Sequence, residues 1–420
     1  MSQTFVEKIL AKYSNKKNVE PSQIVTVKPD HLLTHDNTAA IISKITPELE
    51  KYGVYSKELS IIVLDHVIPA ASEKTATNHK KIREFVKKFN IKNFYDVGAG
   101  VCHQIVVEKG HALPGKILLG SDSHTCSYGA IGAFSSGIDR TEAASLILTG
   151  ETWLKVPGSI KINLEGKLNK GVYSKDLILN VIGDLSASGA NYCSVEYHGD
   201  LENLTVDDRF TVANMGVEMG AKNSVFFVDK VTREYLKKIN VKEDDYLSVK
   251  ADSDAKYLKE YNYDLGELSP VVACPHSVDN VKTVNELGNI EVQQGLIGTC
   301  TNGRESDFYV AAKILKGNKI AKNVRLLILP ASRSIYQNIL KDGLVDIFVD
   351  SGAIILPPGC GPCLGAHQGC LAPNERCIST ANRNFKGRMG CKEAEIYLGS
   401  PATVAASMLT GRITDPRSVM

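Results

Sequence analysis

The sequence has no long apolar run, no strong excess of one charge and no low-complexity tract. Because no apolar run approaches the length of a membrane span, we do not expect the chain to be embedded in a bilayer. The net charge of +2 provides no general attraction for nucleic acid or for an anionic membrane surface. The hydrophobic content of 43% and the charged content of 23% are typical of a soluble globular protein, and they give enough apolar material for a large core.

A recognisable export signal is also missing. The first residues, MSQTFVEKILAKYSNKK, are amphipathic but contain no continuous apolar core and no small-residue cleavage site, so they predict a helix. Ten cysteines are spread between Cys102 and Cys391. A disulfide framework is not expected, because a fold of this size does not need covalent cross-links and no export signal is present. We therefore expect a cytoplasmic protein with mostly reduced thiols.

Short apolar runs alternate with helical patterns along the chain. Runs that predict strands cover residues 60–66, 116–125, 290–300, 324–332 and 351–360, and helical patterns cover 141–148, 304–315 and 403–409. This alternation predicts an α/β architecture with largely parallel sheets. Changes of pattern suggest three α/β domains, at residues 1–157, 158–280 and 281–420. The basic stretch 79–93 has helical spacing, which favours a solvated helix face over a nucleic-acid site.

Reactive side chains repeatedly follow the predicted strands. They are Asp65 and His66; Cys102 and His103; Asp122, Ser123 and His124; Cys300; and Cys360 and Cys363. Ligands of open α/β sheets collect beyond the carboxyl ends of the strands. One such end means little, but five predict one shared site. Sequence neighbours such as Asp122, Ser123 and His124 diverge, so they cannot form a serine-protease triad among themselves.

The stretch PPGCGPCLG, residues 357–365, contains Cys360 and Cys363. Such a pair can be a dithiol switch, part of a zinc site or part of an iron–sulfur cluster. A second CxxC pair, which a structural zinc site would normally need, is absent. The glycine-rich backbone can approach cluster sulfides closely and donate N–H bonds to them. The residues alone favour the cluster and leave the other two readings open.

Motifs along nearly the whole chain together resemble the aconitase superfamily, most closely the large subunits of two-subunit isopropylmalate isomerases and homoaconitases. The motifs are THDNT (34–38), DHVIPA (65–70), VCHQI (101–105), GSDSHT (120–125), NMGVEMG (214–220), GTCTNGR (298–304), PPGCGPCLG (357–365) and NRNFKGR (382–388). His35 in THDNT stands where single-chain aconitases have Gln, so citrate is the less expected substrate.

The resemblance implies a [4Fe-4S] cluster held by Cys300, Cys360 and Cys363, with one iron open to act as a Lewis acid. Cys370 and Cys377 are then bystanders. The remaining implied roles are distributed as follows: Asp65, His66, His103, Asp122, His124 and Glu218 in catalysis, His35, Ser123, Arg383 and Arg388 in substrate binding, and Asn214, Asn302 and Asn382 around the cluster. Arginine suits the binding of carboxylates because its planar fork can be bidentate.

The implied activity is that of a hydro-lyase large subunit in leucine biosynthesis, interconverting 2-isopropylmalate and 3-isopropylmalate by dehydration and rehydration. In this family the serine base and a further arginine come from a swivelling domain. About thirty residues follow NRNFKGR here, so a separate small subunit is expected to supply that domain. Alternatives are a homoaconitase large subunit, another alkylmalate hydro-lyase, or an RNA-binding regulator, which the near-neutral charge disfavours.

Overall fold

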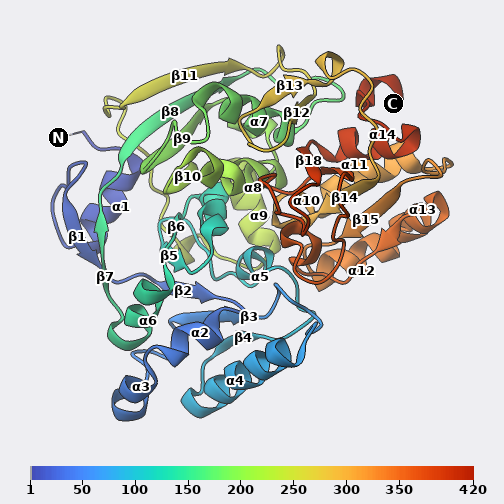
Figure 1. Cartoon of the computed structure of the whole chain (residues 1–420). Coiled ribbons are helices and arrows are strands. Elements are labelled where there is room, and N and C mark those ends of the chain that lie inside the picture. The colour runs from blue at the N-terminus through green and yellow to red at the C-terminus, as the bar shows by residue number, and fades with distance from the viewer. Residues whose placement is uncertain (1) are drawn as a thin grey trace.

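The structure, a computed structural model, describes residues 2–420 and contains three extended sheets that surround a central region (Figure 1). The N-terminal helix α1 (Phe5–Tyr13) lies beside a small antiparallel ribbon of β1 (Ile24–Val27) and β7 (Thr152–Lys155). This helix agrees with the expectation for the N-terminal segment. Within the described residues, no helix combines the length and the apolar character needed to cross a membrane.

The first sheet has the order β4-β3-β2-β5-β6, and all its neighbouring strands are parallel. Its strands are β2 (His31–Thr34), β3 (Ser60–Val63), β4 (Asn93–Tyr95), β5 (Ile117–Gly120) and β6 (Phe134–Gly137). The associated helices are α2 (Thr38–Ser43), α3 (Thr46–Tyr52), α4 (Glu73–Phe89), α5 (Cys102–Glu108), the 3-10 helix η1 (Ser123–Ile131) and α6 (Arg140–Thr149). Because β3, β2 and β5 are adjacent and parallel, the residues that follow them gather at one edge.

The second sheet has the order β10-β9-β8-β11 and is also entirely parallel. Its strands are β8 (Gly158–Glu165), β9 (Cys193–Gly199), β10 (Asn223–Phe226) and β11 (Lys259–Asp264). Its helices are α7 (Ser174–Leu185), α8 (Val206–Asn214), the 3-10 helix η3 (Met215–Met219) and α9 (Lys230–Lys238). A Cβ atom on Gly129 in η1 would lie 1.9 Å from the carbonyl oxygen of Ser224 in β10, so a glycine there allows the two sheets to approach.

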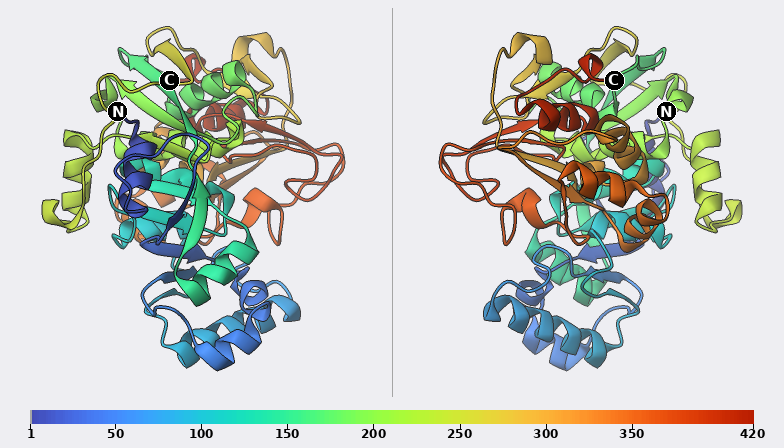
Figure 2. Two further views of the ribbon diagram at one scale, coloured as in Figure 1. Left: turned by 90° about the vertical axis from the view of Figure 1, so that its left-hand side faces the viewer. Right: turned by 90° about the vertical axis from the view of Figure 1, so that its right-hand side faces the viewer.

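The third sheet has the order β13-β12-β18-β17-β14-β15-β16. Its strands are β12 (Val271–Ala273), β13 (Val281–Thr283), β14 (Gln294–Gly298), β15 (Arg325–Leu329), β16 (Ile354–Ile355), β17 (Arg376–Ser379) and β18 (Glu395–Leu398). The strands from β18 to β16 are parallel, whereas β12 is antiparallel to both neighbours. Its helices are α10 (Thr299–Asn302), α11 (Glu305–Leu315), α12 (Arg333–Lys341), α13 (Leu344–Ser351) and α14 (Pro401–Thr410). Figure 2 shows the loops of this C-terminal part extending to one side of the molecule.

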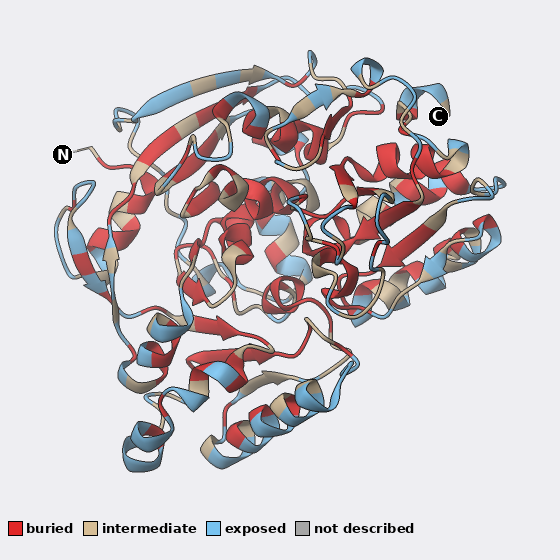
Figure 3. Ribbon diagram, in the orientation of Figure 1, coloured by how far each residue is buried: buried red, intermediate tan, exposed pale blue. Residues whose placement is uncertain are grey.

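Helix α4 shows how local sequence sets an element. It begins after Ser72, whose side chain accepts a hydrogen bond from the backbone N–H of Thr75, and it ends at Asn90 in a left-handed conformation. The residues His79, Ile82 and Phe85 are spaced by three and bury one face. The opposite face is exposed (Figure 3). The helix predicted from the basic stretch is therefore confirmed, and its basic residues lie mostly on a solvated face.

Residues of all three sheets meet in one of the three hydrophobic clusters of the interior. A single cluster of buried residues includes Leu33 and Ile61 from the first sheet, Ile160 and Val195 from the second, and Leu296 from the third. We propose the segments 1–157, 158–280 and 281–420 as domains, each built around one sheet. Strand β12 precedes residue 280 but pairs within the third sheet, so it belongs structurally with the last segment.

The architecture agrees with the expectation from the sequence. The α/β class with largely parallel sheets is confirmed. The five predicted apolar runs contain β3, β5, β14, β15 and β16, and the three helical patterns correspond to α6, α11 and α14.

Candidate active site

Loops that follow strands of the first sheet bring histidines and carboxylates together. His66 Nδ1 lies 2.6 Å from Asp65 Oδ1, and His66 Nε2 lies 3.5 Å from Asp122 Oδ2. Burial would lower the pKa of His66, but the carboxylates of Asp65 and Asp122 outweigh burial and raise that pKa well above its ordinary value of 6.5. The two carboxylates therefore favour the protonated form of His66, which is suited to act as an acid.

Asp122 connects this pair to two further histidines. Its Oδ1 accepts hydrogen bonds from His103 Nε2 at 2.9 Å and from the backbone N–H of His124 at 2.8 Å. Burial would raise the pKa of Asp122, but His103 and the other donors hold it well below its usual range. Tyr128 lies behind His103, with its hydroxyl oxygen 3.1 Å from His103 Nδ1. Asp122 thus stays ionised and fixes the histidines around it.

Glu218 lies in η3, which belongs with the second sheet, and it connects this network to Arg383 beyond the third sheet. His124 Nε2 lies 2.8 Å from Glu218 Oε1, and Arg383 Nε donates to both carboxylate oxygens at 2.8 and 3.0 Å. Burial would raise the pKa of Glu218, but His124 and Arg383 together lower it. One buried carboxylate therefore orients a histidine and an arginine that come from different sheets.

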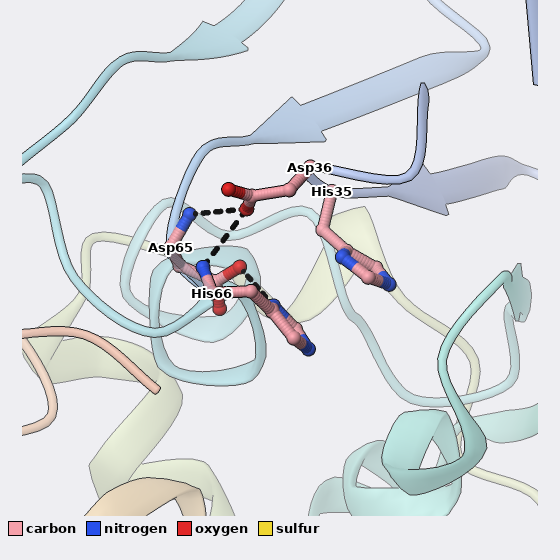
Figure 4. A group of neighbouring side chains, drawn as sticks. All are labelled: His35, Asp36, Asp65 and His66. Atoms are coloured by element: carbon pink, nitrogen blue, oxygen red, sulfur yellow. Dashed lines mark hydrogen bonds and ion pairs between the residues drawn. The ribbon is translucent and has the colours of Figure 1, made fainter. Parts of the chain in front are cut away.

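His35 and Asp36 follow β2 and lie beside Asp65 and His66 (Figure 4). One potential ligand atom from each of these four residues lies within 4.8 Å of the others, a spacing that a cation could use. Asp36, however, accepts hydrogen bonds from the backbone N–H groups of Asp65 and His66 at 3.0 and 2.8 Å, and Asp65 accepts one from Cys102 N–H at 2.7 Å. Because these carboxylates are already satisfied, we interpret the group as a hydrogen-bonded histidine loop.

The ring of His35 stacks on the ring of His66, with centroids 3.8 Å apart and planes inclined by 16°. Burial, followed by the charge of His66, lowers the pKa of His35 to about 4, so His35 is neutral at pH 7. Within residues 2–420, the buried His35 Nδ1 has no hydrogen-bond partner. The stack limits how far the imidazole of His66 can turn.

Three buried cysteines from the third sheet face this network. Cys300 follows β14, and Cys360 and Cys363 follow β16. All three line one cavity of about 140 Å³. The same cavity is lined by Asp65, His66, His103, Asp122, Ser123, His124, Asn382, Arg383 and Arg388, with Val101, Cys102 and Leu364. The structure thus places most of the residues singled out in the sequence around one small space.

Amide and guanidinium groups donate to the cysteine sulfurs. Asn214 Nδ2 and Asn382 Nδ2 lie 3.3 and 3.4 Å from Cys300 Sγ, and Arg388 Nη2 lies 3.2 Å from Cys363 Sγ. Donors of this kind stabilise thiolates and cluster sulfur. Cys300, Cys360 and Cys363 on one cavity fit a cluster held by three cysteines, which leaves one metal position without a protein ligand. Cys102 also lines the cavity.

The pKa values of the three thiols are shifted in different directions. A hydrogen bond from Cys360, with the guanidinium of Arg388 adding to it, holds the pKa of Cys363 well below its ordinary value of 9.0 despite burial. Burial and then the charge of Cys363 raise the pKa of Cys300 to about 12. Burial and mutual repulsion therefore disfavour more than one thiolate in this group.

The turn that carries Cys300 is strained. Gly298 has φ +144°, and a Cβ atom there would lie 2.1 Å from a backbone carbonyl oxygen of β15. Thr299 has φ +72°, a conformation that costs a β-branched residue about 1–3 kcal/mol. Arg304 holds the turn by donating from Nη1 and Nη2 to the carbonyl oxygens of Thr301 and Cys300, both at 3.0 Å. The surrounding structure thus fixes the direction of the Cys300 side chain.

Lys175 is a residue of this site that the sequence did not reveal. It lies in α7 and is fully buried, and its Nζ donates to the carbonyl oxygens of Thr380 and Ala381 at 2.9 and 2.7 Å. Burial lowers the pKa of Lys175 from 10.5 to about 7. Asn382 and Arg383 follow directly, so this ammonium group anchors the segment that presents them. A lysine in a helix that also contains Asp176, Asn180 and Asp184 gives no sequence signal for such a role.

Some candidates lie away from the cavity. Asn302 Nδ2 donates to Thr211 Oγ1 at 3.1 Å and to Asp307 Oδ1 at 2.9 Å, and Asn302 does not line the cavity. Cys377 is buried in β17, and Cys370 is exposed. All ten cysteines in the described part of the chain have free thiols. The cavity-lining cysteines besides the three named above are limited to Cys102, whose pKa burial raises well above its ordinary value.

Comparison with protein families gives a match over almost the whole chain. The model of the aconitase family (aconitate hydratase) covers residues 7–289 and 281–411. The chain belongs to the aconitase family. It is 46% identical over 418 residues to 3-isopropylmalate dehydratase large subunit 1 of Methanopyrus kandleri, with 99% of both chains covered. It is 46% identical over 422 residues to the 3-isopropylmalate dehydratase large subunit of Clostridium kluyveri, with 100% of both covered.

Two further relatives extend the comparison. A probable methanogen homoaconitase large subunit of Methanosarcina mazei is 49% identical over 391 residues, which cover 93% of this chain and 99% of that one. The crystal structure of Thermococcus kodakaraensis aconitase X in its holo-form superimposes with a TM-score of 0.51 at 12% identity, covering 90% of this chain and 89% of that one. At this identity the second likeness shows the shared fold alone.

Proposed function

We propose that this chain is the large, catalytic subunit of a 3-isopropylmalate dehydratase, a hydro-lyase of leucine biosynthesis. The observation that carries the proposal is the single cavity in which three buried cysteines face the His66, Asp122 and His124 network. The names of the relatives, which are large subunits matched over their full length, support it. The substrate class is a small hydroxy acid with two or three carboxylates. Ten free thiols support a reducing compartment, the cytoplasm.

His66 is the proposed general acid. Dehydration requires a proton for the departing hydroxyl, and a histidine held in its protonated form by Asp65 can supply it. Asp65 itself is fixed by the backbone N–H of Cys102, so the imidazole has one preferred orientation. In the reverse direction the same ring takes the proton from the incoming water.

His103, Asp122, His124 and Glu218 are proposed to hold the departing hydroxyl and the returning water. Asp122 and Glu218 remain ionised, and each is hydrogen-bonded to a histidine. Because each carboxylate is paired with an imidazole, a ring nitrogen of His103 or His124 can hold a proton while the substrate changes position. Ser123 lines the same cavity and is proposed to hydrogen-bond to the substrate.

Arg383 and Arg388 are proposed to bind the substrate carboxylates. Both line the cavity, and Glu218 fixes Arg383 through its Nε atom. The base that removes the carbon-bound proton is proposed to come from a separate small subunit, together with a further arginine. The word "large subunit" in the names of the relatives supports such a partner.

Cys300, Cys360 and Cys363 are proposed to hold a [4Fe-4S] cluster. When bound, the cluster would supply a Lewis acid for the substrate hydroxyl and a neighbouring carboxylate. Asn214, Asn382 and Arg388 would donate hydrogen bonds to its sulfur ligands, as they do to the thiols. His66 and the arginines line the same cavity as the cysteines.

A homoaconitase large subunit is the second candidate. The 49% identity with the Methanosarcina mazei protein favours it. Both substrates present carboxylates and a hydroxyl to the same residues of this chain. The two candidates therefore differ mainly in the groups that face the cavity from the partner.

Anaerobic turnover tests the proposal. The chain, reconstituted with iron and sulfide, is assayed with 3-isopropylmalate and, separately, with homoisocitrate by the absorbance of the unsaturated intermediate. Each assay is made with and without the cognate small subunit. We expect turnover of 3-isopropylmalate only in the presence of both subunits. Substantial turnover by the large chain alone would refute the placement of the base, and turnover of homoisocitrate alone would favour the second candidate.

A further inference from the structure

Asp36 binds the loop that carries the proposed general acid, although it does not line the cavity. Its Oδ2 accepts hydrogen bonds from the backbone N–H groups of Asp65 and His66 at 3.0 and 2.8 Å, and its Oδ1 accepts one from Val67 at 3.2 Å (Figure 4 shows the first two). Three successive amides therefore converge on one carboxylate. We call residues 65–67 the acid loop.

The other side of Asp36 is tied to helix α4. His79 Nε2 lies 2.8 Å from Asp36 Oδ1, and only 2% of His79 is exposed. Burial would raise the pKa of Asp36, but His79, followed by His66 and the backbone amides, lowers it. Asp36 is thus a charged link between a long helix and the acid loop.

The acid loop is also joined to the cysteine segment. The backbone N–H of Cys360 donates to the carbonyl oxygen of Asp65 at 2.8 Å, and His367 Nε2 lies 2.9 Å from the carbonyl oxygen of Ile68. The N–H groups of the acid loop therefore point to Asp36, while the carbonyl group of Asp65 in the loop, and that of Ile68 just after it, lie within hydrogen-bond distance of the segment that carries the cysteines. Asp36 is the only side chain among the described residues that binds all three amides of the loop.

We propose that Asp36 is the positioning residue for His66, holding the acid loop so that the imidazole faces the cavity. Its side chain does not line the cavity, and it acts through the backbone of the loop. The inference rests on the proposed function in one respect, the role of His66 as general acid. A displacement of about 1 Å at a reacting group can reduce a rate by about 10²-fold, so loosening the loop should be visible in turnover.

The test is Asp36→Asn in the reconstituted two-subunit enzyme. Asparagine keeps the shape but turns an NH₂ group toward backbone donors. We expect kcat to fall about 10–100-fold while KM changes by less than about 3-fold, since substrate contacts remain. The matched control is Asp30→Asn at the opposite end of β2, where Asp30 accepts the backbone N–H of Ile117 at 2.9 Å. Asp30→Asn should leave kcat within about 2-fold.

A second arm separates positioning from a general structural effect. In a His66→Ala background, Asp36→Asn should lower kcat by no more than about 2-fold further, because the group it positions is already gone. If the losses of the two single variants multiply instead, Asp36 acts elsewhere and the proposal is overturned. Should Asp36→Asn fail to fold, His79→Gln carries the same comparison, with a smaller loss that also disappears in the His66→Ala background.

A third arm does not depend on activity. In the cluster-free chain labelled with ¹⁵N-histidine, the Nδ1 proton of His66, 2.6 Å from Asp65 Oδ1, gives a signal that is identified by its loss in His66→Ala. Asp36→Asn should shift or broaden this signal, and Asp30→Asn should not. An unchanged signal together with wild-type kcat overturns the proposal. If the wild-type complex has no turnover, the proposed function fails, while the NMR comparison still decides the positioning role.

Discussion

Lys175→Met should leave the stability of the chain nearly unchanged and yet impair turnover. Keeping the Lys175 proton in the folded state, where its pKa is lowered from 10.5 to about 7, costs about 5 kcal/mol. Methionine removes this cost but leaves the carbonyl groups of Thr380 and Ala381 without a donor, at about 1–3 kcal/mol each. The two effects are of similar size, so we expect the unfolding free energy at neutral pH to change by less than about 2 kcal/mol.

The lowered pKa of Lys175 also predicts the direction in which stability changes with pH. Between pH about 7 and 10.5 the unfolded chain keeps the Lys175 proton and the folded chain has lost it. The unfolded state therefore binds more protons in this window, and the contribution of Lys175 to stability rises with pH. Below pH 7 the folded state bears the full free-energy cost of keeping Lys175 protonated. Lys175→Met should lack this rise when its unfolding curves are compared with those of the wild type.

Turnover measurements test whether Lys175 positions the segment that carries Arg383. Without the ammonium group the segment that presents Asn382 and Arg383 loses two hydrogen bonds, and we expect kcat/KM of the reconstituted complex to fall at least about 10-fold. The control is Lys319→Met, because Lys319 donates to the carbonyl oxygen of Asp350 at an exposed site. A loss of more than about 4 kcal/mol in stability would show that Lys175 is mainly a stabilising residue. Normal turnover would show that it does not position Arg383.

Two further predictions concern the acid and the cluster. The His66→Ala variant should keep its iron, but its kcat should be about 10²–10⁴-fold lower than that of the wild type. In the wild type, kcat should fall as the pH rises through the raised pKa of His66, because the protonated ring is the active form. A flat alkaline limb would exclude this role. Serine variants of Cys300, Cys360 or Cys363 should each lose iron after anaerobic reconstitution, whereas Cys377→Ser should retain it; equal loss in Cys377→Ser would contradict an open metal position.

The strand-end residues could be predicted because short-range rules apply to them. An apolar run followed by a polar turn, as at Asp65 and Asp122, predicts both the strand and the edge at which its side chains emerge. Parallel pairing of β3, β2 and β5 then brings these side chains together without further information. The contribution of Glu218 is different. Glu218 lies in the 3-10 helix η3, beside the second sheet. The motif that contains it indicated that it belongs to the site, whereas its position relative to the predicted strands did not.

The roles of other residues could not be predicted from the sequence because these residues bind backbone groups. Asp36 and Lys175 bind amide or carbonyl groups that lie far away along the chain, whereas Arg304 binds carbonyl groups of the turn just before it. No pattern of side chains records such contacts with the backbone. Asn302 shows the opposite case. It stands within the motif of Cys300, but its amide donates toward Thr211 and Asp307, since the direction of a side chain in a one-turn helix depends on packing.

The site thus has two layers with different tasks. Residues of the cavity wall are placed to contact a ligand, whereas Asp36, Lys175 and Arg304 each bind the backbone of one wall segment: the acid loop, the segment before Arg383 and the turn at Cys300. Because the wall is assembled from separate sheets, an error in any one segment would displace its groups relative to the others, and buried charge-assisted hydrogen bonds limit that error. None of the three touches the cavity, so none can select a substrate. Substrate selection by this chain is therefore expected from the residues of the cavity wall.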